Sequence, residues 1–186
     1  MKLLIMGPPG VGKGTQAKII KDELGIAHIS TGELLRDEIA EKTDIGFVAK
    51  KYIDQGKLVP DEYLFEIVRE RLNKPDCSNG YILDGFPRTL NQATGLEIIM
   101  DEYEQVLNKA ISLYADEDDL VERLVKRGED SGRSDDTSII IRNRQKIYWQ
   151  QTAPLLDFYN ERKLLNNING LGEIKEITNR ILSTLK

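Results

Sequence analysis

A glycine-rich loop near the start of the chain constrains the fold more than any other stretch. Residues 2–6 (Lys-Leu-Leu-Ile-Met) form a short apolar run, residues 7–16 (Gly-Pro-Pro-Gly-Val-Gly-Lys-Gly-Thr-Gln) follow at once, and an amphipathic stretch covers residues 17–24. This order is typical of a strand, a loop and a helix. The glycines allow successive backbone N–H groups to point inward at phosphate oxygens, which the helix N-terminus also favours. The sequence therefore predicts a phosphate-binding loop, with Lys13 as its positive charge.

The loop departs from the general pattern at one position. Gly7 and Lys13 fit G-x-x-x-x-G-K, but Gly14 stands where Ser or Thr usually follows, and Thr15 comes one residue later. The hydroxyl that normally contacts Mg²⁺ is therefore missing from its usual place. A plain turn between a strand and a helix is the alternative, but strand, loop, lysine and helix together favour phosphate binding.

The composition indicates a soluble globular protein. The chain has 186 residues, 40% of them hydrophobic and 31% charged, which suits a single domain over residues 1–186 with small insertions. A net charge of −5 argues against general binding to nucleic acid or to anionic membranes. No apolar run could span a bilayer, and the first residues lack the pattern of a signal peptide. Cys77 is the single cysteine and His28 the single histidine, and we expect both to be structural and the protein to be cytoplasmic.

Apolar runs predict five short strands, at residues 2–6, 27–29, 81–83, 110–114 and 164–168. Helical stretches separate them, so the expected fold class is α/β, a three-layer fold with a five-stranded parallel sheet flanked by helices. Two of the helices lie between residues 30 and 59. They predict a small helical insertion beside the crevice where such sheets bind ligands.

A second candidate site follows the third predicted strand. Asp84 ends this strand, as does the carboxylate that holds Mg²⁺ in many phosphate-loop proteins. The alternative is a simple Asp-Gly turn, but the loop upstream favours a metal. Because Gly14 supplies no hydroxyl, we expect water and phosphate to hold most of the Mg²⁺, with Asp84 acting through water.

Five stretches resemble the nucleoside monophosphate kinases, and adenylate kinases most of all. They are residues 7–16, 30–36 (Ser-Thr-Gly-Glu-Leu-Leu-Arg), 56–60 (Gly-Lys-Leu-Val-Pro), 84–88 (Asp-Gly-Phe-Pro-Arg) and the arginine-rich stretch 126–144. In that family glycine also follows the loop lysine. The resemblance implies a P-loop fold with an AMP-binding insertion at 30–59 and a short lid loop at 126–136. It also implies reversible transfer of the terminal phosphoryl group of ATP to AMP, giving two ADP, with Mg²⁺ as cofactor.

The resemblance further implies a role for each matching residue. The catalytic residues would be Lys13, Arg88, Arg123, Arg133 and Arg144. ATP would be bound by Gly10, Val11, Gly12, Lys13, Gly14, Thr15, Arg127 and Gly172. AMP would be bound by Thr31, Arg36, Lys57, Leu58, Val59, Gly85, Phe86, Pro87, Arg88, Gln92, Arg133 and Arg144.

Two interpretations are open for a group of four arginines, Arg123, Arg127, Arg133 and Arg144. Arg123 and Arg127 are spaced i, i+4, which also suits a solvated helix face. The resemblance instead places them around the phosphates, oriented by Asp135 and Asp136 through charge-assisted hydrogen bonds. Only five residues separate Arg127 from Arg133, where long bacterial forms carry a β-rich lid, some with a four-cysteine zinc site. The resemblance therefore implies a short lid without zinc.

The alternatives come from inside and outside the family. Within it they are a UMP-CMP kinase and a GTP:AMP phosphotransferase. Relatives that prefer UMP and CMP generally carry alanine at the position of Thr31, so Thr31 favours AMP. Outside it, a GTPase switch is disfavoured by Gly14, and a nucleotide-binding module without catalysis leaves the arginines unexplained. The resemblance implies ATP, AMP and ADP as the partners and a monomeric protein.

Overall fold

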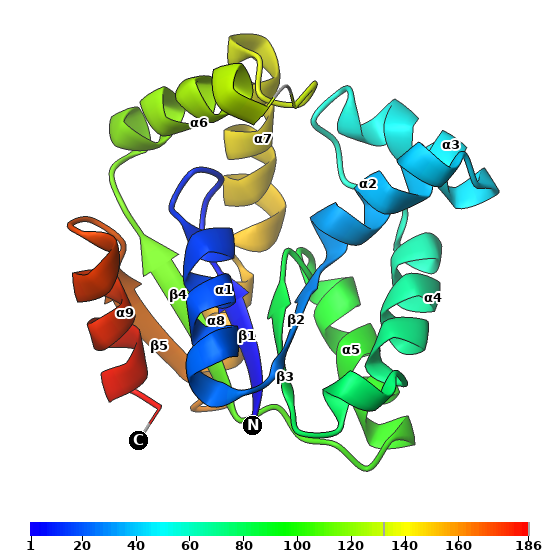
Figure 1. Cartoon of the computed structure of the whole chain (residues 1–186), viewed down its shortest axis with the longest axis vertical. Helices are drawn as coiled ribbons and strands as arrows, with labels where there is room; N and C mark the ends of the chain where they lie inside the picture. The colour runs from blue at the N-terminus through cyan, green and yellow to red at the C-terminus, as the bar shows by residue number, and fades with distance from the viewer. Residues whose placement is uncertain (132, 186) are drawn as a thin grey trace.

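The computed structural model describes residues 1–131 and 133–185 (Figure 1). Gly132, which falls within the predicted lid, and Lys186 lie outside the described residues. The strands are β1 (Lys2–Met6), β2 (Ala27–Ser30), β3 (Tyr81–Asp84), β4 (Lys109–Tyr114) and β5 (Leu165–Asn169). The helices are α1 (Lys13–Leu24), α2 (Thr31–Glu41), α3 (Asp44–Ile53), α4 (Asp61–Leu72), α5 (Leu90–Glu102), α6 (Glu117–Ser131), α7 (Ser138–Ile147), α8 (Leu155–Glu161) and α9 (Ile174–Ser183). A 3₁₀ turn at Pro75–Cys77 and a π-helical turn at Tyr148–Thr152 complete the elements.

The five strands form one parallel sheet in the order β2-β3-β1-β4-β5. Leu4 of the central strand lies opposite Leu83 of β3 and Ala110 of β4. Because all the strands run the same way, their carboxyl ends share one edge of the sheet, and the phosphate loop and residue 85 start from that edge. The α/β class and the parallel sheet predicted from the sequence are confirmed.

Alternate residues of each strand face opposite layers of helices, which explains why the inner strands are apolar throughout. Leu3 and Ile5 pack in one core with residues of α1 and α9, and Figure 1 shows these two helices side by side on one face of the sheet. Leu4 and Met6 pack in the other core with residues of α4, α5 and α8. The sheet is therefore the middle layer of three.

Side-chain oxygens cap the first turns of α2 and α3. Thr43 accepts a hydrogen bond from the backbone N–H of Gly46 at 3.0 Å, as a capping residue should. Ser30 accepts one from the N–H of Glu33 at 3.4 Å. The carboxylate of Glu33 pairs with Lys18 at 3.2 Å, so the second bond of a full capping box is replaced by an ion pair.

The predicted lid loop at 126–136 starts too early. The α6 helix continues to Ser131, so residues 126–131 are helical and only a short connection remains before α7. Gly128 did not break the helix because it packs closely on another segment: a Cβ there would lie 2.9 Å from the carbonyl oxygen of Asp136. Tertiary contact thus outweighed the turn preference of glycine. Within the described residues, no helix has both the length and the apolar character needed to cross a membrane.

Substitution in a central strand should show how much the buried side chains of the sheet contribute to the free energy of unfolding. Leu83→Ala should lower the free energy of unfolding by about 2–5 kcal/mol, because the side chain is fully buried and its removal leaves a cavity. Urea titration measures this. Ile98→Ala on α5 is the control, since that side chain is 56% exposed. Equal losses in the two variants would contradict this account of the core.

Candidate active site

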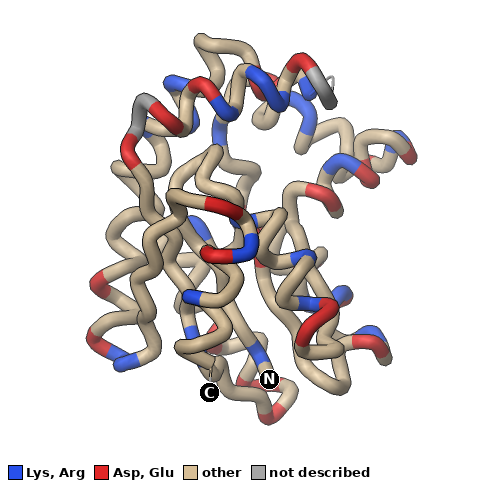
Figure 2. The backbone as a smooth tube through the Cα atoms, turned by 60° about the vertical axis from the view of Figure 1, so that its left-hand side comes forward, with Lys and Arg blue, Asp and Glu red and all other residues tan. Residues whose placement is uncertain are grey.

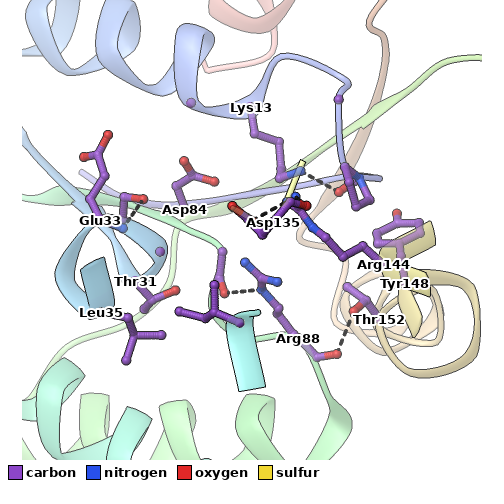
Figure 3. A pocket seen from close by; sticks show the side chains of 18 of the residues that line it. Lys13, Thr31, Glu33, Leu35, Asp84, Arg88, Asp135, Arg144, Tyr148 and Thr152 are labelled. Atoms are coloured by element: carbon purple, nitrogen blue, oxygen red, sulfur yellow. Dashed lines mark hydrogen bonds and ion pairs between the residues drawn. The ribbon is translucent and has the colours of Figure 1, made fainter. Parts of the chain in front are cut away.

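A pocket of about 420 Å³ opens at the carboxyl edge of the sheet, and Figure 3 shows side chains entering it from several elements. Its walls come from the phosphate loop, the start of α2, residues 56–59, the segment after β3, the middle of α6, and α7. It brings together most of the residues predicted from the sequence, namely Gly10, Gly12, Lys13, Gly14, Thr15, Thr31, Arg36, Lys57, Leu58, Val59, Asp84, Gly85, Pro87, Arg88, Arg123, Arg127, Arg133 and Arg144.

A second, smaller pocket of about 270 Å³ lies on the other side of the phosphate loop. Val11 and Gly172, both predicted as ATP-binding, line this pocket and not the first. Arg123 and three residues of the loop line both pockets. The loop therefore stands between two adjoining spaces.

Two predicted residues line neither pocket. Phe86 is fully buried and packs edge-on against Phe65, with 6.1 Å between the ring centroids. Gln92 is also fully buried, and its amide accepts from the N–H of Arg88 and donates to Asp61, both at 2.7 Å. In this arrangement Gln92 holds the backbone of residue 88. The predicted contacts of Phe86 and Gln92 with AMP stay predictions.

The loop geometry requires glycine and curls Lys13 back over its own backbone. Gly10 has φ +90°, and a Cβ there would lie 2.7 Å from the carbonyl oxygen of Leu120. The α1 helix begins at Lys13, whose Nζ donates to the carbonyl oxygens of Gly7 at 2.8 Å and Pro8 at 3.0 Å. Burial lowers the pKa of Lys13 to about 7; Asp84 opposes this, and the nearby arginines reinforce it. A bound anion would favour the charged form.

Asp84 is a buried carboxylate in the pocket wall, close to Lys13. Burial would raise its pKa, but His28 and the positive charges of Lys13 and Arg88 outweigh burial and lower the pKa. The Nε2 atom of His28 lies 3.5 Å from Oδ2 of Asp84, at the long limit of a hydrogen bond, so His28 acts on the carboxylate as a weakly bonded neighbour. Asp84 is therefore ionised at neutral pH.

Cations from separate elements converge on the same space. Figure 3 shows Lys13, Arg88 and Arg144 directed into the pocket from the loop, the segment after β3 and α7. The Nε of Arg88 donates to the carbonyl oxygen of Gly85 at 2.8 Å. Burial lowers the pKa of Arg88, and Arg144 lowers it further. Burial also lowers the pKa of Arg36, with Arg133 acting in the same direction. Since arginine remains protonated even so, the pocket is strongly positive and suited to anions.

Two aspartates hold Arg127 of α6 and Arg144 of α7 in place, as predicted for these two of the four arginines. Asp136 accepts from Nε and Nη2 of Arg127, both at 2.7 Å, and from Nη1 of Arg144 at 2.7 Å. Asp135 pairs with Arg144 at 2.9 Å. Burial would raise the pKa of Asp136, but the hydrogen bonds and charges of both arginines lower it. Figure 2 shows Lys and Arg interspersed with Asp and Glu along the arm that α6 and α7 form at the top of the view. One carboxylate thus links two helices.

Sequence reasoning missed two residues on the helical face below Arg144. Tyr148 and Thr152 line the pocket, and the hydroxyl of Thr152 donates to the carbonyl oxygen of Arg88 at 2.9 Å. The available signal was their spacing from Arg144, four residues for Tyr148 and eight for Thr152, which places them on one helical face. Gln145 was also missed: its Nε2 donates to the carbonyl oxygen of Pro9 at 3.1 Å, which joins α7 to the phosphate loop. Nothing in its local sequence pointed to that contact.

One stretch of the chain matches the guanine-binding pattern N-K-x-D of GTPase switches, at residues 73–76 (Asn-Lys-Pro-Asp). It lies after α4 and before β3, so at the amino edge of the sheet, opposite to both pockets. Asp76 there forms an ion pair with Arg71 at 2.7 Å. The position of this stretch disfavours the GTPase alternative.

The described side chains give a metal few protein ligands. Among the side chains that the structure describes, no group of three or more His, Cys, Asp or Glu could together hold a metal ion. A cation at Asp84 would therefore take most of its ligands from water and from a bound anion, as Mg²⁺ commonly does. Taken together, the geometry suits the binding of several phosphate groups.

Comparison with known proteins identifies the family. The family model described as adenylate kinase matches residues 5–164. The adenylate kinase of Leptospira biflexa serovar Patoc is 48% identical over 184 residues, which is 99% of both chains. That of Bifidobacterium longum is 47% identical over 186 residues, the whole of both chains, and that of Nocardioides sp. is 44% identical over 185 residues, covering 100% of this chain and 97% of the relative.

Binding of a polyphosphate should be linked to proton uptake by Lys13. At about pH 8 most of a lysine with a pKa of about 7 is neutral, and an anion favours the charged form. Titration calorimetry with inorganic tripolyphosphate in buffers of different ionisation enthalpy should show uptake, and the affinity should fall as pH rises through 7. Lys13→Arg is the control, because arginine stays charged and the anion's own ionisation cancels in the comparison. Equal uptake by both proteins would contradict the role of Lys13.

Loss of the Asp136 charge should loosen the junction of α6 and α7. Asp136→Asn should lower the free energy of unfolding by about 1–3 kcal/mol at pH 7. The loss is at the lower end for a buried ion pair, because water screens the partly exposed side chain of Arg127. Since the folded-state pKa is lowered, the contribution is present above the unfolded value of about 4 and is lost as pH falls through the folded value. Urea titrations at neutral and acidic pH should show the two proteins converging in acid. A difference that persists undiminished there would contradict the charge pairing.

Proposed function

This chain belongs to the adenylate kinase family, and we propose how its pockets carry out the transfer of the terminal phosphoryl group of ATP to AMP. The chain is an ATP:AMP phosphotransferase, and the reaction is reversible and gives two ADP. The convergence of Lys13, Arg88 and Arg144 on one pocket is the observation that carries the proposal. Lys13 and Arg88 donate to backbone carbonyl oxygens, so their charges stay available to phosphate.

ATP is assigned to the loop and the second pocket. Its phosphates bind the backbone of residues 10–15 and the ammonium of Lys13, and Arg127 lies at their outer side. The positive end of α1 favours them as well. The base lies towards Val11 and Gly172, because the second pocket continues directly from the loop.

AMP is assigned to the space between α2 and the segment after β3. Its phosphate is bound by Arg36 and Arg88. Burial and nearby arginines lower the pKa of both side chains, so a bound anion would stabilise their charged forms. Thr31, Leu58 and Val59 face the same pocket and form the wall for the base. The remaining residues proposed for AMP are Lys57, Gly85, Phe86, Pro87, Gln92, Arg133 and Arg144.

The phosphoryl group passes between these two sides. The acceptor is a phosphate oxygen that is already ionised at neutral pH, so no general base is required. Catalysis then consists of holding donor and acceptor in line and neutralising the charge on the transferred group. Arg123, Arg133 and Arg144 supply that charge together with Lys13 and Arg88. Water is a competing acceptor. Two arms, the α6–α7 pair and the α2–α3 insertion, lie over the pocket, and contact between them serves to exclude water.

Mg²⁺ is the proposed cofactor, and the donor set fits it. Asp84 is ionised, lines the pocket and supplies the oxygen ligand type that Mg²⁺ prefers. A Cβ on Gly14 would lie 3.4 Å from Oδ2 of Asp84, so the absence of a side chain at that position leaves space beside the carboxylate. When bound, Mg²⁺ neutralises charge on the outer phosphates of the donor. Asp84 holds it through water.

We also propose that the protein acts as a cytoplasmic monomer without nucleic-acid or membrane partners. Its single cysteine suits a reducing compartment, and its net charge of −5 disfavours polyanions. Its exposed large apolar side chains, such as Phe47, Ile98 and Val106, are spread over different elements and do not indicate a subunit interface. Sedimentation measures the oligomeric state.

The acceptor assay tests the function directly. ADP formation from Mg-ATP is measured with AMP, UMP, CMP and GMP supplied one at a time, and we expect a strong preference for AMP. Turnover with UMP or CMP would contradict the assignment of Thr31 to adenine. ATP binding without transfer to any acceptor would contradict the enzymatic proposal.

Arg88→Ala should reduce AMP-dependent turnover by about 10²- to 10³-fold, because a buried cation at the transferred charge is lost. Initial rates with saturating ATP and AMP measure this effect. Arg69→Ala is the matched control, since Arg69 lies on α4 in an exposed pair with Glu102. Unchanged activity of Arg88→Ala, or an equal loss in both variants, would contradict the role of Arg88.

A further inference from the structure

A triangle of polar contacts, formed by Gln16, Thr178 and the carbonyl oxygen of Ile174, joins α1 to α9 beside the second pocket. The Nε2 of Gln16 donates to the carbonyl oxygen of Ile174 at 3.1 Å. The hydroxyl of Thr178 lies 2.8 Å from Oε1 of Gln16 and 2.9 Å from the same Ile174 oxygen. Gln16 is 2% exposed and Thr178 is 7% exposed. An amide bonded at both ends in a buried setting fixes the distance between the two helices that it joins.

The triangle spans two opposite walls of that pocket. Gln16 belongs to the first turns of α1, where its backbone N–H donates to the carbonyl oxygen of Gly12 at 3.0 Å, so it moves with the phosphate loop. Ile174 is the first residue of α9 and lines the pocket together with Gly172. The spacing between the loop and the segment 172–174 therefore depends on the Gln16 amide.

Other hydrogen bonds hold the wall segment from the side of α9. The guanidinium of Arg180 donates to the carbonyl oxygens of Asn169 at 2.9 Å and Leu171 at 2.8 Å. The carboxylate of Glu176 accepts from the N–H of Glu173 at 3.2 Å. These contacts fix the shape of the segment on α9. They do not reach α1, whereas Gln16 does.

We propose that Gln16 and Thr178 are positioning residues for the base of the donor nucleotide. They act through the backbone at residues 172–174, which they hold at the distance from the phosphate loop that a bound nucleoside triphosphate spans. Thr178 satisfies the amide oxygen of Gln16 and so fixes the direction in which the amide nitrogen points. This proposal rests on the proposed function, which assigns the second pocket to the base of ATP.

The test distinguishes the contribution of the base to nucleotide binding from that of the phosphates. Thr178→Val keeps the shape of the side chain but removes its hydroxyl, and Thr178→Ser retains the hydroxyl. Binding of ATP and of inorganic tripolyphosphate, which has no base, is measured by calorimetry. Thr178→Val should weaken ATP about 5- to 10-fold, because a buried amide oxygen loses its donor, while tripolyphosphate affinity stays the same. Thr178→Ser should restore ATP binding.

Kinetics and a control give further readouts. The KM for ATP should rise in Thr178→Val, whereas the KM for AMP should stay unchanged. Thr184→Val makes the same chemical change at the far end of α9, where the hydroxyl donates to Ile181 at 2.8 Å, and it should alter neither KM. Thermal unfolding of every variant checks that each is folded.

A variant on the other helix keeps the test independent of Thr178. Gln16→Met removes the amide at similar length and should cause the same selective loss of ATP affinity. The double variant should be no worse than the single ones, because either change breaks the same triangle. Additive losses, equal weakening of ATP and tripolyphosphate, or unchanged ATP binding would overturn the proposal. Failure of the wild-type protein to form ADP from ATP and AMP would instead overturn the proposed function, which these binding comparisons do not require.

Discussion

Repulsion between like charges is the constraint on which the rest of this structure depends. Lys13, Arg88 and Arg144 must lie close together in a partly dry pocket before any phosphate arrives to balance them. Burial lowers the pKa of Lys13 and of Arg88, and neighbouring arginines lower both further, which is the part of the shift that repulsion contributes. In the proposed function the same positive field attracts the polyphosphates and stabilises the transferred phosphoryl group.

The fold meets this constraint by supplying the cations from different elements and bonding each of them to a fixed acceptor. Lys13 and Arg88 are held by carbonyl oxygens of the turns that follow β1 and β3. Arg127 and Arg144 share the buried carboxylate of Asp136, which fixes α6 against α7. Parallel strands make this possible because their carboxyl ends meet at one edge. The sheet therefore keeps the cations close together, although their mutual repulsion alone would drive them apart.

The α6–α7 arm and the α2–α3 arm meet over the pocket. The contacts between them are weaker than those that hold the charged side chains beneath. Ser134 donates to Asp54 at 2.9 Å and Asn143 donates to the carbonyl oxygen of Gln55 at 2.7 Å, which links the α7 side to the end of α3. Both bonds are exposed to water, so each contributes little to stability. Such bonds suit arms that must separate to admit nucleotides and meet again to exclude water. The buried triangle at Gln16 has the opposite character and keeps its spacing throughout.

The sequence by itself determined the phosphate loop, the parallel sheet and most of the residues that line the first pocket. Those features are local: a glycine pattern, apolar runs and short motifs each specify their own backbone, and the order of strands and helices specifies the sheet. Tertiary structure alone decided the rest. Gly128 lies in a helix because Asp136 packs against it, and the amide of Gln92 turns to Asp61 and Arg88 rather than to the pocket. Gln16 and Thr178 are 162 residues apart in the chain, and only the packing of α9 on α1 brings them together. Contacts between distant segments depend on how whole layers pack, and no short stretch of sequence encodes that.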